Sequence, residues 1–140
     1  MREILFRGKR VDKGEWTEGY LFKQWNRTFL LWGMTDDIQN MTEVIPETVG
    51  QYTGLTDKNG KKIFEGDIIR AITLDTGSEE IAAVCFGNFI DENNGDEYIG
   101  FFIEFDGIKT TATQLAMEEC KNRIEIIGNI FDNQELLEVE

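Results

Sequence analysis

The sequence of 140 residues contains no histidine, one proline and two cysteines. Without an imidazole, the chain cannot carry the hydrolase triads that depend on histidine, or a metal site built on imidazole ligands. Cys85 and Cys120 form no zinc pattern, and Cys85 lies in the apolar run from Ile81 to Phe86, which predicts a buried, inert thiol. No stretch approaches the ~20 apolar residues of a membrane span. We therefore expect a protein of a reducing cytoplasm that does not contact membranes.

Basic residues are also scarce, at 14 Lys and Arg against 27 Asp and Glu, which gives a net charge of −13. This balance disfavours binding to a phosphate backbone and to an anionic membrane. The charge is uneven along the chain. Residues 1–27 hold seven bases and four acids, whereas no base lies between Arg70 and Lys109 or after Arg123. The sequence thus predicts a small basic end and a larger acidic one, although excess carboxylates also serve solubility alone.

Hydrophobic residues recur mainly with a period of two, which is typical of strands. The length suits one domain over 1–140. We predict a mainly β fold, a small SH3-like or pseudo-barrel of short antiparallel strands, with a polar loop at 33–40, an ambiguous segment at 115–122 and a short helix from Asp132 or Asn133 to Leu137. The expected strands cover residues 4–10, 15–22, 28–32, 41–45, 68–74, 81–86, 98–105, 108–115 and 123–130.

Turn chemistry is clearest in the middle of the chain. Asn59-Gly60 lies between two β-prone arms, which predicts a hairpin whose two turn residues both take positive φ. Glu65-Gly66-Asp67 predicts a second turn, and Gly128 within the last strand predicts a bulge, a barrel corner or a close backbone approach. The residues assigned to turns and the bulge are Gly54, Asn59, Gly60, Gly66, Asp67 and Gly128.

Residues 49–69, VGQYTGLTDKNGKKIFEGDII, resemble the signature of the YopX family of phage and prophage proteins. The start, REILFR at 2–7, and the end, IEIIGNIFDNQELL at 124–137, are similar to the first and last segments of that family. The resemblance implies a largely β, barrel-like domain encoded by a bacteriophage or an integrated prophage, located in the cytoplasm of the bacterial host. It implies no established activity and no catalytic residue.

Two acidic groups invite a metal interpretation. Glu65 and Asp67 flank one turn and would suit acid–base chemistry or a divalent cation, but nothing supplies the remaining ligands. The loop 91–97 is rich in carboxylates, but glycine stands at its fifth place and Phe102 at its twelfth, so the helix–loop–helix calcium motif is excluded. We predict no metal site, no cofactor and no catalytic residue. Adventitious binding of a cation by this loop stays open.

Aromatic residues alternate with bases near the N-terminus. Small β-barrels can bind nucleic acid by stacking nucleobases on such aromatic rings. A nucleic-acid face there would use Arg7, Lys9, Arg10, Trp16 and Tyr20, or the same rings would fill the core.

Three function classes follow from the sequence. The leading one is a non-enzymatic binding module that acts through protein–protein contact, including a version in which its acidic face imitates a phosphate backbone and occupies a basic host protein. The second is a nucleic-acid-binding β-barrel, which the net charge opposes. The third is a carboxylate–metal hydrolase. Strand edges of such a short β domain further suggest a homo-oligomer.

Overall fold

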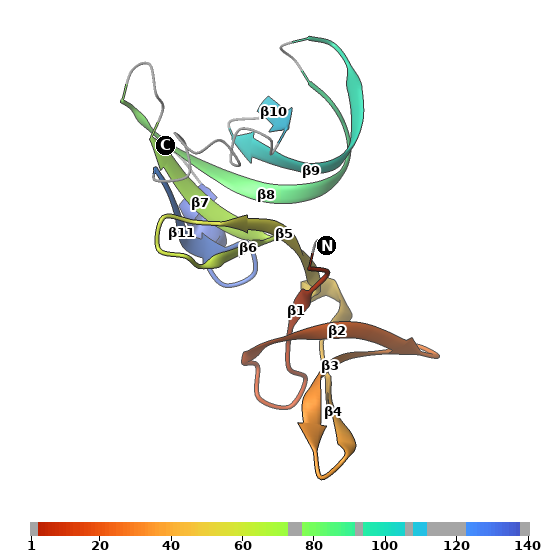
Figure 1. Ribbon diagram of the computed structural model, residues 1–140. Helices are drawn as coiled ribbons and strands as arrows, with labels where there is room; N and C mark the ends of the chain where they lie inside the picture. The colour runs from red at the N-terminus through yellow and green to blue at the C-terminus, as the bar shows by residue number, and fades with distance from the viewer. Residues whose placement is uncertain (1–2, 73–76, 92–93, 106–107, 112–122, 138–140) are drawn as a thin grey trace. The chain divides into compact units, whose positions relative to one another are not determined.

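The computed structural model describes residues 3–72, 77–91, 94–105, 108–111 and 123–137. The described chain is mainly β, as predicted, and its strands form two antiparallel sheets (Figure 1). Hydrogen bonding orders them β4-β3-β2-β1-β5-β6 and β10-β9-β8-β7-β11. The chain also divides into two compact units, residues 1–54 and 55–140, which we call the N-terminal and C-terminal units. The prediction of one folding domain stays a prediction, because compactness and folding cooperativity are different properties.

The N-terminal unit is a run of antiparallel neighbours in chain order. Its strands are β1 (Phe6–Lys9), β2 (Trp16–Gln24), β3 (Arg27–Thr35) and β4 (Ile38–Glu43), and β1 also pairs with β5 (Gly50–Thr56). A 3₁₀ turn, η1 (Pro46–Thr48), connects β4 to β5.

The core of the N-terminal unit contains Leu30 and Val44, both almost completely buried. Gly8 faces Val44 so closely that an added Cβ would lie 3.0 Å from the Val44 Cβ. Arg10 and Val44 form a β-bridge, and the Val11 amide donates to the Glu43 carbonyl. The chain after β1 therefore covers the outer edge of β4 from Glu43 onward.

The polar loop predicted at residues 33–40 is wrong. Strand β3 continues to Thr35 and β4 begins at Ile38, so that only Asp36 and Asp37 form the turn. Both have positive φ, 51° and 65°, as a two-residue type I′ hairpin turn requires. The sequence hid this turn because neither residue is glycine.

The C-terminal unit begins within β5 and contains the second sheet. Its strands are β6 (Lys62–Phe64), β7 (Asp67–Ile72), β8 (Glu79–Ile90), β9 (Glu97–Phe105), β10 (Ile108–Thr111) and β11 (Ile124–Asn129). Strand β8 lies between β7 and β9, in agreement with the central strand expected at 81–86. The buried cluster of this unit comprises Ile63, Ile69, Ala82, Val84, Ile103 and Ile124.

The Asn59-Gly60 hairpin forms with a different turn from the one predicted. Gly60 has φ +80°, but Asn59 is not among the described residues with positive φ. The Gly60 amide donates to the Asp57 carbonyl at 3.0 Å, and the Asp57 amide donates to the Lys61 carbonyl at 2.8 Å. This is a turn followed by one left-handed glycine, a common three-residue hairpin loop that requires positive φ only at its last position.

The chain reverses sharply after β11. The β7–β11 register shifts between Ile126 and Gly128, and a Cβ on Gly128 would lie 2.6 Å from the Asn133 Oδ1. The Asn133 side chain accepts a hydrogen bond from the Asn129 amide at 3.2 Å. The predicted C-terminal helix is wrong: only the 3₁₀ turn η3 (Gln134–Leu137) forms, too short to close an α-helical ladder.

Some expectations concern residues outside the described ranges, namely segment 115–122, Cys120 and the later part of the strand expected at 108–115. The SH3-like assignment stays a prediction. Among the described residues, no helix has the length and apolar character needed to cross a membrane.

Candidate interaction surface

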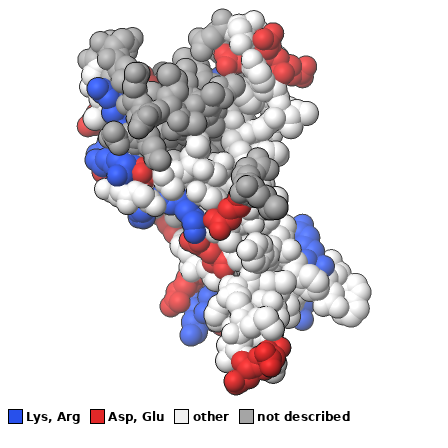
Figure 2. All heavy atoms as spheres, in the orientation of Figure 1, with Lys and Arg blue, Asp and Glu red and all other residues white. Residues whose placement is uncertain are grey.

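Large apolar side chains of the N-terminal unit remain exposed along β2, β3 and β4. Clusters of exposed apolar residues, in contrast to single ones, mark interaction sites. We call this set the hairpin surface, although strand alternation places its members on both faces of the sheet; it comprises Tyr20, Leu21, Phe22, Trp25, Trp32, Met34, Ile38 and Met41. Figure 2 shows broad uncharged areas over this unit, with acidic atoms at the end that carries the β3–β4 turn.

Strand register explains how part of this surface is built. Tyr20 on β2 lies opposite Leu31 on β3, which in turn lies opposite Met41 on β4. Directly opposed residues point to the same face of a sheet, so these three side chains form a row across three strands. Tyr20 and Met41 are exposed and Leu31 is half-buried. In the next row, Phe22 and Phe29 approach with ring centroids 6.2 Å apart.

Among the residues that the structure describes, Trp25 is the most exposed large apolar one, with 92% of its surface accessible. It occupies the two-residue turn between β2 and β3, since Gln24 pairs with Arg27, and its φ is +57°. A bulky residue rarely adopts this region, which costs of order 1–3 kcal/mol. The chain thus bears both backbone strain and an exposed indole at this tip. The two-residue hairpin turn itself requires the positive φ, so the exposed indole is the feature that distinguishes this tip.

The bases of the predicted nucleic-acid face are largely engaged within the chain. The Arg7 guanidinium and the Lys9 ammonium lie over the Trp16 ring, 4.8 Å and 5.7 Å from its centroid. Arg10 makes a two-bond ion pair with Asp12, both bonds 3.0 Å long.

The structure therefore brings Arg7, Lys9 and Trp16 together, whereas Arg10 pairs elsewhere. By strand alternation, Tyr20 lies farther along the same face of β2 as Trp16. Because cations already cover the Trp16 ring, it is poorly placed to stack a nucleobase.

Of the two acids predicted as a possible metal or acid–base pair, Asp67 has a structural role. Asp67 is buried, and its Oδ2 accepts a hydrogen bond from the Phe64 amide at 2.7 Å, so this carboxylate caps the turn before β7. Glu65 is half-buried. Within the described ranges, no cluster of three or more metal-ligating side chains is found.

The described part of the acidic loop is closed by its own backbone. The Asp91 amide donates to the Asp96 carbonyl at 2.9 Å, and the Gly95 amide donates to the Asp91 carbonyl at 2.7 Å. Asn94 Oδ1 accepts a bond from the Asp96 amide.

Asp57 is a second buried carboxylate of the signature segment, only 2% exposed. Its Oδ1 accepts hydrogen bonds from the Asn59 and Lys61 amides, both at 2.9 Å, and its Oδ2 accepts one from the Ile126 amide at 3.1 Å. Burial raises the pKa of Asp57, but the three bonds outweigh it and leave the pKa below its ordinary value. The role of Asp57 is structural: it joins the hairpin turn to β11.

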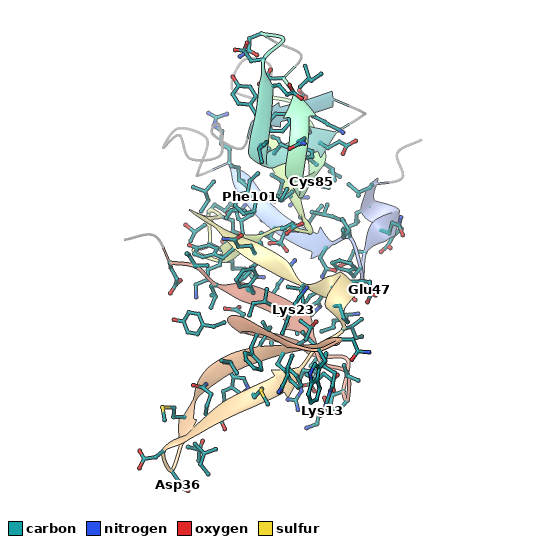
Figure 3. The ribbon with its side chains drawn as sticks, turned by 90° about the vertical axis from the view of Figure 1, so that its right-hand side faces the viewer. Lys13, Lys23, Asp36, Glu47, Cys85 and Phe101 are labelled. Carbon is teal, nitrogen blue, oxygen red and sulfur yellow. The ribbon has the colours of Figure 1, made fainter. Side chains whose placement is uncertain are left out.

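The surroundings of Cys85 disfavour its thiolate. Burial, reinforced by the charges of Glu104 and Glu65, raises the pKa of the Cys85 thiol to about 11. The neutral thiol of this half-buried residue is therefore the form present at neutral pH. Figure 3 shows it on β8, close to Phe101 of the neighbouring strand β9.

Comparison with known proteins places the chain in a family. The family described as YopX protein matches residues 5–138, nearly the whole sequence. The chain belongs to the YopX family. This confirms the resemblance read from the signature segment and the two ends. A search of curated protein sequences finds no match.

A solved structure resembles that of this YopX-family protein. It is the crystal structure of protein EF1440 from Enterococcus faecalis, with a TM-score of 0.53 and 22% sequence identity. The alignment covers 99% of this chain and 100% of the other. At this identity, the likeness concerns the fold alone.

Proposed function

We propose that this YopX-family protein is a non-catalytic, phage- or prophage-encoded binding module that acts through protein–protein contact, with the hairpin surface as its docking site. The observation that carries this proposal is Trp25, an almost fully exposed indole held on a left-handed backbone. Tryptophan is enriched among the residues that dominate the energetics of protein interfaces. The row of Tyr20, Leu31 and Met41 adds an apolar area on the same sheet.

The net charge differs between the two units and suggests a different role for each. Residues 55–140 contain seven bases and nineteen acids, a net charge of −12, whereas residues 1–54 contain seven bases and eight acids, a net charge of −1. An acidic unit of this strength attracts basic partners over a distance and accelerates their association. In this proposal, the carboxylates of the C-terminal unit compete for a basic host protein as a phosphate backbone would, while the hairpin surface supplies the apolar contact.

The nucleic-acid alternative has less support. Its bases are engaged by Trp16 and by Asp12, and Arg27 is engaged by Glu43 in a two-bond ion pair of 2.9 and 3.2 Å. Association with nucleic acid depends on cations that can replace the counterions of phosphates. Fluorescence anisotropy with single-stranded and duplex oligonucleotides at 50 mM salt should show no binding. Salt-sensitive binding there would favour the alternative.

The docking proposal is tested by capture of partners from a bacterial lysate on the immobilised protein, at low and high salt. Trp25→Asn removes the indole but keeps a residue that tolerates positive φ. We expect it to reduce the amount of the captured protein at least tenfold. Ile99→Asn is the matched control, because Ile99 is also a highly exposed apolar residue, at 78%, but lies on β9 of the C-terminal unit. Equal losses from both variants would refute docking through the hairpin surface.

The decoy part of the proposal is tested by the identity and salt response of the captured protein. A basic partner whose recovery falls between 50 mM and 500 mM salt is expected, because salt screens charge attraction. Recovery of only neutral or acidic partners, unchanged by salt, would reject the decoy and leave the apolar docking intact.

A further inference from the structure

The outer edge of β4, which we call the β4 edge, is the segment from Ile38 to Thr42. In the sheet order, β4 is the last strand, and within the described ranges no strand pairs with this edge. Protection begins only at Glu43, whose carbonyl accepts the bond from Val11. Natural proteins protect exposed edges with lysines, prolines or covering segments. The sequence Ile-Gln-Asn-Met-Thr of the β4 edge has neither a charge nor a proline.

Hydrogen bonding fixes which groups of the β4 edge point outward. The Val44 amide donates inward to the Thr28 carbonyl of β3, whereas the Glu43 carbonyl accepts from outside. Backbone groups alternate along a strand, so Thr42 and Asn40 also point toward β3. Gln39 and Met41 therefore present their N–H and C=O groups outward.

We propose that a second copy of this chain docks on the β4 edge, antiparallel and related by a two-fold axis at Asn40. In this register, Gln39 of each copy lies opposite Met41 of the other, and the outward groups of both residues are satisfied by four hydrogen bonds. A two-fold interface is self-complementary by construction. A register centred on Met41 would instead require the Glu43 carbonyl, which Val11 already occupies.

The side chains around the β4 edge favour a copy of the same strand as its occupant. Ile38 is 69% exposed and Met41 is 50% exposed, so added strand pairing also buries apolar surface. A two-fold axis perpendicular to the sheet keeps corresponding faces on the same side. The row of Tyr20, Leu31 and Met41 would thus continue into the row of the second copy, through its Gln39.

The distribution of charge along the chain favours self-association through the N-terminal unit. Two copies of a chain with net charge −13 repel each other, but the repulsion arises mainly from residues 55–140, at −12, and hardly from residues 1–54, at −1. The acidic Asp36-Asp37 turn lies just beyond the β4 edge, and Figure 3 shows Asp36 at the end of the hairpin. Salt that screens these charges should therefore strengthen the dimer, the opposite of its effect on a charge-complementary complex.

The oligomeric state is measured by size-exclusion chromatography with light scattering over a range of protein concentrations and salt. We expect a mass that rises from 16.1 kDa toward twice that value, and more readily at 500 mM than at 50 mM salt. Met41→Lys should raise the dissociation constant of the dimer at least tenfold, since a lysine on an edge strand opposes pairing with another strand. Ile99→Lys is the control, because it adds the same charge to an exposed position of β9 and should not weaken the dimer. A monomer under all conditions, or equal effects of the two variants, would overturn the proposal.

The register is read by cysteine cross-linking in a variant whose two natural cysteines are serine. Directly opposed residues that share no hydrogen bonds have Cα atoms about 4.5 Å apart, within the range of a disulfide. Asn40→Cys should therefore cross-link two copies under mild oxidation, whereas Gln39→Cys and Met41→Cys should not. Cross-linking at either of those positions in place of residue 40 overturns the register.

Amide hydrogen exchange of the unmodified protein provides an independent test. The Met41 amide should gain at least tenfold protection as the protein concentration rises, while the Thr42 amide, already bonded to β3, should not change. The inference does not rest on the proposed function, because it is argued from the backbone of the β4 edge, which is unpaired among the described strands. Met41 also belongs to the hairpin surface, so Trp25→Asn separates the two proposals: this variant should lose capture of host proteins and still dimerise.

Discussion

Removal of the Asp57 carboxylate should strongly destabilise the C-terminal unit. Asp57→Ala leaves three backbone amides, those of Asn59, Lys61 and Ile126, without their charged acceptor. Hydrogen bonds to charged groups contribute about 1.5–3 kcal/mol each, so the free energy of unfolding should fall by roughly 4 kcal/mol or more. That is a large part of the about 5–15 kcal/mol that stabilises an ordinary domain.

Asp57→Asn tests the contributions of the two carboxylate oxygens separately. The amide oxygen can replace Oδ1 and keep the bonds from Asn59 and Lys61, but the amide nitrogen then meets the Ile126 N–H, donor against donor. The loss should be about 2 kcal/mol, roughly half that of alanine. Asp96→Asn, at an exposed position, is the control and should remain within about 0.5 kcal/mol of the natural protein.

Urea unfolding followed by circular dichroism measures these differences. The pKa of Asp57 is lowered in the folded state, so its charge stabilises the fold above the unfolded pKa, about 3.9, and this contribution is lost as the pH falls through the folded pKa. The gap between the natural protein and Asp57→Asn should therefore be constant above about pH 5 and shrink in acid. A loss below about 1 kcal/mol for Asp57→Ala, or equal losses for alanine and asparagine, would refute the account.

Three further substitutions or modifications test the local geometry. Gly128→Ala should cost about 1–3 kcal/mol in urea unfolding because its Cβ would clash with the Asn133 side chain, and addition of Asn133→Ala should recover part of that loss. Replacement of Asp36-Asp37 by Asn-Gly should raise stability by about 1 kcal/mol, since both positions are left-handed, and an unchanged melting temperature would contradict the turn assignment. Cys85 should resist alkylation at pH 8, where about a thousandth of it is thiolate, until urea unfolds the protein; the other cysteine is replaced by serine for this assay.

The β class and the signature turns could be predicted from the sequence because they depend on local chemistry. Period-two hydrophobicity requires only the pleat of a strand, and Gly60 is left-handed in the structure because glycine pays little for that conformation. The Asp36-Asp37 turn was missed for the converse reason: its backbone is left-handed without a glycine. The terminal helix was predicted wrongly because Asp132 and Asn133 are typical residues for the start of a helix, whereas the segment that follows them is too short for an α-helix.

The hairpin surface could be predicted only in part. The aromatic residues of β2 are visible in the sequence, but the row from Tyr20 to Met41 depends on the pairing of three strands. The type of an aromatic residue does not reveal whether its ring is buried or exposed. The sequence alone therefore could not show that Phe29 is buried and Trp25 exposed. The division into two units was also hidden, because β5 continues through residue 54 without a linker.

The long-range bond of Asp57 has a consequence for protein synthesis. Strands β1 to β4 pair with their immediate successors, so the first unit can assemble as soon as its own segment leaves the ribosome. Asp57, however, waits for the amide of Ile126, 69 residues later. A message truncated before β11 would therefore release a finished first unit joined to a second one in which Asp57 lacks the hydrogen bond from Ile126.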